Sequence, residues 1–161
     1  MRTISELAFD HILEKLRAQE ISLANLRNQA AISGAVTGLI GTVMVNVLFS
    51  IVDVGQRSVF FGENWLCATF VFFLFGGSIL FSGLVLTSFQ EFHFSFDAKK
   101  MLEGRDRTNE DFLSNYVKDG EWYFSDNEGL ISGIQTYLWF SVVCGWMQII
   151  PWAELISKGI Q

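Results

Sequence analysis

The side chains that most often do chemistry are few in this sequence and are poorly placed for it. His93 is one of two histidines, and the two cysteines, Cys67 and Cys144, each lie inside an apolar run. The sequence has no Ser-His-Asp set, no Cys/His spacing typical of a metal site and no glycine-rich phosphate loop. We therefore expect buried thiols rather than a disulfide or a metal pair. We also expect no catalytic, cofactor-binding or metal-binding residues, His93 included, and no enzyme activity.

The composition favours a lipid bilayer over a nucleic acid as partner. The chain has 161 residues, of which 50% are hydrophobic and 17% are charged, with a net charge of −6. Globular proteins average about 25% charged residues, so the apolar excess must be concentrated in particular segments. A negative chain lacks the basic surface that phosphate binding needs, and we expect no nucleic acid partner.

Three long uncharged runs predict three transmembrane helices, at residues 28–52, 64–90 and 129–153. The middle run is dense in Phe, Leu and Val, lacks the polar stripe of a soluble core helix and exceeds the roughly 20 apolar residues that cross a bilayer. None of the runs holds a carboxylate or a lysine, which are the usual mark of pumps and ion-coupled carriers. The predicted fold class is an all-α integral membrane protein that forms a single membrane domain, residues 1–161.

Residues 3–27 predict a long amphipathic helix ahead of the first span. Thr3 and Glu6 have the spacing of a capping box. A heptad line follows in alternating steps of three and four, with the charged residues off it: Phe9, Ile12, Leu16, Gln19, Leu23, Leu26 and Ala30. This line is typical of a helix packed on its own chain or on the membrane surface, and equally of a coiled coil between subunits. No Gly or Pro precedes Gly34, so we expect the helix to continue into the first span.

Small residues on the spans predict where helices touch. Four-residue steps place small or polar side chains on one face of the first span: Ala30, Gly34, Gly38, Thr42 and Asn46. Small residues let helix backbones approach closely in lipid, where the Asn46 amide also needs a partner. The later spans contribute Gly76 and Gly83, with Ser78 and Ser82 nearby, and Gly145, which shares a face with Ser141. The patch around Gly76 and Gly83 predicts a close crossing, for which the line on the first span is one candidate. We interpret these residues as helix-packing or oligomerisation positions, and packing within the chain, packing between subunits and a pore-lining Asn46 all stay open.

The remaining charge lies mostly in a polar insert, residues 91–128, between the second and third spans. Phe92, Phe94 and Phe96 alternate with polar residues, as in a short strand or an interfacial aromatic segment. Residues 98–103 predict one or two helical turns. Further signals predict two helix starts and a turn between them: Thr108 with Asp111, Ser125 with Glu128, and Asp119-Gly120. The insert is too acidic and too broken to form its own core, so we expect it to pack on the bundle, on a neighbouring subunit or on a protein partner.

Basic residues predict the orientation. The insert holds five of them (Lys99, Lys100, Arg105, Arg107 and Lys118), whereas the short loop 53–63, which simply turns the chain back, has Arg57 alone. Cytoplasmic loops carry the excess of Lys and Arg, so the N-terminus and the insert are predicted to be cytoplasmic and the C-terminus outside.

Two runs of sequence carry a resemblance to a known group of proteins. They are LANLRNQAAISGAVTGLIG at 23–41, in which Arg27 and Ala30 have the Arg-x-x-Ala spacing of the group's signature, and FHFSFDAKKML at 92–102. The chain resembles small, uncharacterised bacterial three-span membrane proteins. It is similar in layout to the SLATT-type membrane effectors of antiphage systems, which are thought to breach the inner membrane when triggered. The resemblance implies a homo-oligomeric inner-membrane effector that forms an ion channel or perturbs the membrane in antiviral defence. The alternative hypothesis is a non-enzymatic accessory or structural subunit of a larger membrane complex.

Overall fold

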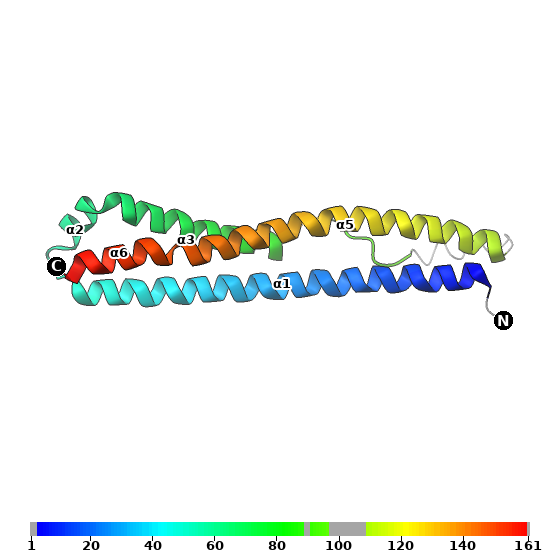
Figure 1. Ribbon diagram of the computed structural model, residues 1–161, viewed down its shortest axis with the longest axis horizontal. Coiled ribbons are helices and arrows are strands. Elements are labelled where there is room, and N and C mark those ends of the chain that lie inside the picture. Colours follow the sequence, from blue (N-terminus) through cyan, green and yellow to red (C-terminus); the bar gives the residue numbers. More distant parts are fainter. Residues whose placement is uncertain (1–2, 89–90, 97–108, 161) are drawn as a thin grey trace. The chain divides into compact units, whose positions relative to one another are not determined.

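The structure, a computed structural model, describes residues 3–88, 91–96 and 109–160. In these residues the chain is helical apart from short connections, and it has no strand. The helices are α1 (Ile4–Ile51), α2 (Arg57–Glu63), α3 (Trp65–Leu86), α5 (Asn109–Met147) and α6 (Ile149–Ile160) (Figure 1). The predicted all-α class is therefore confirmed.

Three stretches are long and apolar enough to cross a membrane, as the sequence predicts. They are α1, α3 and the stretch Glu110–Ile160, which comprises α5 and α6. Many large apolar side chains on these helices are exposed, among them Phe72 (74%) and Phe73 (69%) on α3. Apolar exposure of this extent marks a surface that contacts lipid or another protein.

The chain folds as two compact units. The first comprises the described residues of 1–25 and 89–133, and the second those of 26–88 and 134–161. Both α1 and α5 contribute to the two units, because each helix passes a unit boundary.

Helix α1 begins at the predicted capping box and has no break before the first predicted span. The Thr3 N–H donates to Glu6 Oε2 at 2.9 Å, and the Glu6 N–H donates to Thr3 Oγ1 at 3.3 Å. These two bonds satisfy backbone donors that a helix start leaves free. The continuation of the amphipathic helix into the first span is therefore confirmed.

The heptad line of α1 is the buried face of the first unit. Ile12, Leu16, Gln19 and Leu23 are buried there. The Phe9 ring stacks on Phe96 with the centroids 5.6 Å apart. In this structure the line packs on its own chain, the first of the arrangements that the sequence left open.

Two predictions for the insert are wrong, because α5 is continuous where the sequence predicts a turn and a new helix start. Asp119-Gly120 lies inside α5, as do Ser125 and Glu128. The turn prediction is wrong because the glycine serves close packing: a Cβ on Gly120 would lie 2.7 Å from Ile12 Cγ1 and 2.9 Å from Phe96 Cζ. The start at Ser125 is wrong because the uninterrupted helix leaves no free N–H groups there for a cap to satisfy.

The rest of the insert is only partly described. Residues 91–96 are non-helical and form no strand, so of the two readings for the alternating phenylalanines the strand does not occur there. A helix does begin at Asn109, close to the predicted start. The predicted turns at 98–103, and Thr108 itself, lie outside the described residues.

The loop after α1 does more than reverse the chain, since it contains the two-turn helix α2. Arg57, the first residue of α2, donates from Nη2 to the Phe49 carbonyl at 2.8 Å and from Nε to the Val52 carbonyl at 3.3 Å. Its guanidinium also lies 4.5 Å from the centre of the Phe49 ring. A cation on the free carbonyls at a helix C-terminus is stabilising, so Arg57 holds the end of α1 against the turn.

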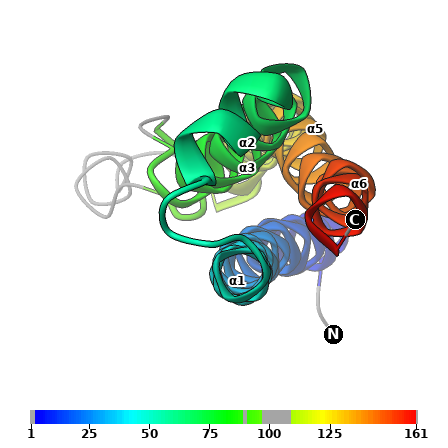
Figure 2. The same cartoon turned by 90° about the vertical axis from the view of Figure 1, so that its left-hand side faces the viewer.

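At one end of the second unit, α1, α3 and α6 surround a hydrophobic core (Figure 2). Leu48 and Val52 contribute from the end of α1, Val71 from α3, and Trp152 and Leu155 from α6. Three helices that pack in this way bury their inner faces and leave their outer faces exposed.

A break at Gln148 separates α5 from α6. Pro151 explains it, because proline has no N–H to donate to the carbonyl four residues earlier, at Met147, and its ring crowds that carbonyl. The helix resumes at once, since the Trp152 N–H donates to the Gln148 carbonyl at 3.2 Å.

Gly120 gives a direct test of packing in the first unit. We expect Gly120→Leu to lower the thermal stability of the purified protein and to expose residues of the first unit to protease, because Ile12 and Phe96 leave no space for a side chain. Gly129→Leu is the matched control on α5, since nothing lies within 4 Å of a Cβ there. Equal melting temperatures for the two variants would contradict this packing.

Candidate functional site

Five hydroxyl groups from three helices meet inside the second unit, and we call them the hydroxyl cluster. Ser33 and Thr37 come from α1, Ser78 and Ser82 from α3, and Ser141 from α5. Ser33 is half-buried and the other four are buried. Each hydroxyl has a partner within the cluster, so these polar groups are satisfied in an otherwise apolar interior.

Ser78 and Ser141 form the centre of the cluster. The Ser78 hydroxyl donates to the Ser141 carbonyl at 2.9 Å, and the Ser141 hydroxyl donates to the Ser78 carbonyl at 3.0 Å. Ser82 Oγ and Ser33 Oγ lie 2.7 and 3.1 Å from Ser141 Oγ, and Thr37 Oγ1 lies 2.9 Å from Ser78 Oγ. Every pair of the three helices is therefore joined by hydrogen bonds.

The cluster fits only because Gly145 lies beside it. A Cβ on Gly145 would come within 2.7 Å of Thr37 Oγ1 and 3.2 Å of Ser78 Oγ, whereas a Cβ on Gly34 would lie 3.5 Å from Ser82, an ordinary contact distance. The absence of a side chain at Gly145 lets α5 approach α1 and α3 closely enough for hydroxyl contacts. Small residues and interhelical hydroxyl bonds are the usual means by which helices associate in lipid.

The structure divides the predicted packing residues into two groups. Gly34 and Gly145 lie beside the hydroxyl cluster, within the chain. The others do not pack there: nothing lies within 4 Å of a Cβ on Gly38, Gly76 or Gly83, and Thr42 and Asn46 are exposed. Their role in oligomerisation stays a prediction.

Helix geometry explains why the predicted line leaves the interior. Four residues turn an α-helix by about 400°, so each four-residue step moves the side chain about 40° around the axis. The line starts at buried Ala30, passes half-buried Gly34 and Gly38, and reaches the exposed Thr42 and Asn46.

Two residues of the cluster, Ser33 and Thr37, were not predicted from the sequence, although a signal for them is present. Beyond Ala30, the heptad line of α1 continues by steps of three and four to Ser33 and Thr37. Alternating steps keep side chains on one face, so extending the line would have placed both hydroxyls inside. Ser78 and Ser82 belong to the small-residue patch that predicts a close crossing with the first span, and in the structure they lie beside Thr37 and Gly34 of α1.

Another missed residue, Asn127, organises the first unit. Its fully buried amide accepts a hydrogen bond from the His93 N–H at 3.0 Å and donates to the His93 carbonyl at 2.9 Å. It also donates to Gln19 Oε1 at 3.2 Å, while Gln19 Nε2 donates to the Phe124 carbonyl at 2.9 Å. Gln19, the one polar residue of the heptad line, is thus paired. Asn127 in turn holds the segment 91–96 on α5.

The side chains that could take part in catalysis or bind a metal do not come together in one site. The His93 ring stacks on Tyr123, with the ring centres 4.9 Å apart. Cys67 and Cys144 are free thiols, so no disulfide joins them. Within the described residues, no group of three or more His, Cys, Asp or Glu side chains is placed to hold a metal ion.

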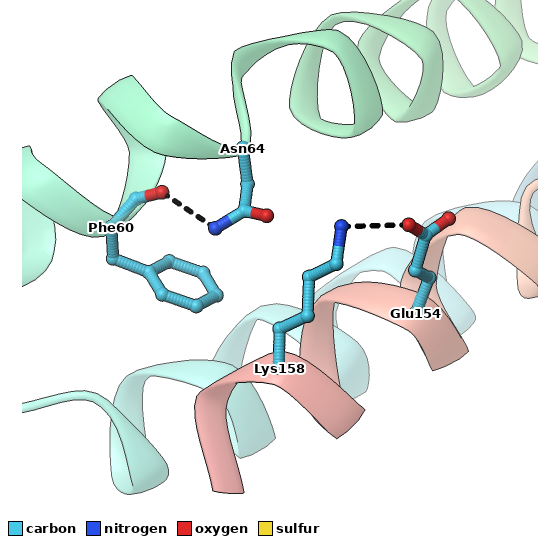
Figure 3. Close-up of polar contacts among 4 residues, drawn as sticks. All are labelled: Phe60, Asn64, Glu154 and Lys158. Carbon is cyan, nitrogen blue, oxygen red and sulfur yellow. Dashed lines mark hydrogen bonds and ion pairs between the residues drawn. The ribbon is translucent and has the colours of Figure 1, made fainter. Parts of the chain in front are cut away.

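One ion pair, between Glu154 and Lys158 of α6, lies near the junction of α2 and α3 (Figure 3). Lys158 Nζ lies 2.7 Å from Glu154 Oε1, one helical turn away on α6. Across from them, Asn64 Nδ2 donates to the Phe60 carbonyl at 3.0 Å and closes the junction of α2 and α3. Both charged side chains are well exposed, so the pair contributes little to stability.

Comparison of the chain with protein-family models, with curated proteins and with solved structures gives no match. What defines the protein is therefore its fold and its site. In the residues that the structure describes, it is all-helical, with three stretches long and apolar enough to cross a membrane that are joined in one unit through hydroxyl groups.

Gly145 tests the close approach at the cluster. We expect Gly145→Leu to lower the melting temperature in detergent strongly, because the new side chain would displace Thr37 and Ser78. Gly76→Leu is the control, since Gly76 faces open space. If the two variants melt alike, α5 does not approach the other helices as described.

Ser141→Ala tests the hydrogen bonds themselves. It removes the shared partner of Ser33 and Ser82, and we expect a loss of about 1 kcal/mol, the scale of interhelical hydrogen bonds in membranes. Reversible unfolding in mixed micelles measures this difference. Ser157→Ala, at an exposed position of α6, is expected to change nothing. A fully stable Ser141→Ala variant would show that the cluster contributes no stability.

Proposed function

We propose that this protein is a homo-oligomeric bacterial inner-membrane effector that forms or opens a pore. The observation that carries the proposal is a strip of small and polar side chains on the outer face of α1. Three facts support it: the polarity of that strip, the unpaired amide on it, and the large apolar side chains around it and on the other helices.

One strip of the exposed surface of α1 carries small and polar side chains along the predicted first span, beside large apolar residues such as Leu39 and Val43. Asn28, Ala31, Ala35, Thr42 and Asn46 are all exposed there, on the side away from the buried heptad line. A strip of this kind is poorly suited to lipid tails and well suited to a water-filled channel or to another helix.

Asn46 is the most informative residue on this face. The Thr42 hydroxyl donates to the Gly38 carbonyl at 2.9 Å, and the Ser50 hydroxyl donates to the Asn46 carbonyl at 2.8 Å, so both hydroxyls are satisfied by their own helix. No described residue pairs with the Asn46 side-chain amide. An amide in hydrocarbon is costly without a partner, and water in a pore or a second subunit supplies one.

The outer faces of α3 and α5 are those of helices that contact lipid. Phe72 and Phe73 on α3 are 74% and 69% exposed, and Trp139 and Trp146 on α5 are 61% and 67% exposed. In an oligomer, these faces point to the bilayer and α1 lines the centre. Several copies are needed, because one copy of α1 cannot enclose a channel.

The proposed orientation follows the basic residues. The N-terminus and the insert are on the cytoplasmic side, which places the first unit in the cytoplasm, and the C-terminus lies outside. A trigger could act on this unit, because α1 and α5 join it directly to the spans. The similarity in layout to SLATT-type effectors supports a role in antiphage defence by analogy alone.

An accessory subunit of a larger membrane complex is the second candidate. It is favoured by the exposed acidic side chains on the first half of α5, namely Glu110, Asp119, Glu121, Asp126 and Glu128. A basic partner surface would complement them. Purification separates the two proposals: a symmetric assembly of this chain alone supports the pore, and a stoichiometric second protein supports the accessory role.

Asn46 tests the pore. In cells that carry a membrane-potential dye, we expect induced expression of the wild type to depolarise the membrane. We expect Asn46→Leu to reduce this depolarisation severalfold, because the polar centre of the α1 face is lost. Thr69→Leu is the control, since it changes an exposed polar residue of α3. An intact potential and normal growth with the wild type under triggering conditions would contradict the proposal.

A further inference from the structure

Gln148, at the break between α5 and α6, is the one described side chain amide that is both fully buried and unpaired. Its exposed fraction is 0%, and neither Nε2 nor Oε1 has a hydrogen-bond partner among the described residues. Gln19 and Asn127, the other buried amides of the described chain, both have partners. A buried amide left unpaired costs about 1–3 kcal/mol, so its presence calls for an explanation.

A second unpaired group lies one helical turn further on. Trp152 is 6% exposed, and its indole Nε1 likewise has no partner in the described part of the chain. Residues four apart lie on the same helix face, with Cβ atoms about 5–6 Å apart, and the later side chain leans back over the earlier turn. The bond from the Trp152 N–H to the Gln148 carbonyl confirms that this turn is helical.

We infer that Gln148 and Trp152 form a binding site for buried water. Together they present an acceptor at Gln148 Oε1 and donors at Gln148 Nε2 and Trp152 Nε1. A buried water needs about 2–4 polar partners, and these three atoms supply that number. Ordered water is also a usual companion of a helix broken by proline at membrane depth, as Pro151 breaks this one.

A groove in the same unit reaches one of the two residues, Trp152. It has a volume of about 440 Å³ and lies between α1, α3 and α6, with Trp152, Thr42 and Asn46 among its lining residues. The exposed Asn46 amide and the Trp152 side chain therefore line one and the same groove. The water site follows from burial and unpaired atoms, and it does not depend on the proposed pore.

Hydroxyl-radical footprinting of the purified full-length protein in detergent micelles tests the inference, with Trp152 oxidation read by mass spectrometry. X-ray irradiation generates radicals from bound water, so wild-type Trp152 is expected to be oxidised although it is buried. In Gln148→Leu, we expect Trp152 oxidation to fall by at least about threefold, because one of the two residues holding the water is gone. Oxidation of Trp122, an exposed residue of the first unit, is expected to stay unchanged.

Two further variants make the test decisive. Gln135→Leu removes an exposed glutamine from α5 and is expected to leave Trp152 oxidation at the wild-type rate. Gln148→Asn keeps an amide and is expected to keep more of the oxidation than Gln148→Leu. Wild-type Trp152 that resists oxidation would overturn the inference without any variant. Equal oxidation in the wild type and Gln148→Leu would overturn it as well.

Discussion

The second unit depends on the reciprocal bonds between Ser78 and Ser141. Between apolar helices in lipid, one register is nearly as good as another, because the lipid tails are as apolar as the side chains. A hydroxyl that donates to a carbonyl on a facing helix is satisfied at few positions. The two bonds, with Ser33, Thr37 and Ser82 around them, select one alignment of three helices. Gly145 permits that alignment, because it leaves the space that the hydroxyls fill.

In the first unit, the register of the packed helices is fixed by side-chain amides rather than by hydroxyls. Its α1 segment buries a heptad line whose apolar members would tolerate a shift of one turn. Gln19 and Asn127 prevent it, since their amides pair with each other and with backbone groups of His93 and Phe124. A buried polar pair of this kind specifies register at some cost in stability.

Helix α1 passes through both units, and the proposed pore uses its outer face. Its inner face packs through apolar side chains in both units and through hydroxyls in the second. On its outer face, the Asn46 amide has no partner in the described chain. A single helix therefore orders the subunit and also presents the polar strip on which the proposed function rests. In that proposal, assembly through the strip would link the packing of the subunit to the pore of the oligomer.

Sequence alone determined the elements of this protein, because local signals set them. The uncharged runs predicted the three membrane-length helices, and the capping box at Thr3 and the heptad line predicted where α1 begins and which side it buries. Tertiary structure decided the rest. Asp119-Gly120 has the composition of a turn, but packing against Ile12 uses the glycine inside a helix. The hydroxyl cluster and the Asn127 contacts join residues far apart in the chain, and spacing along a chain carries no information on which distant helix a side chain will meet.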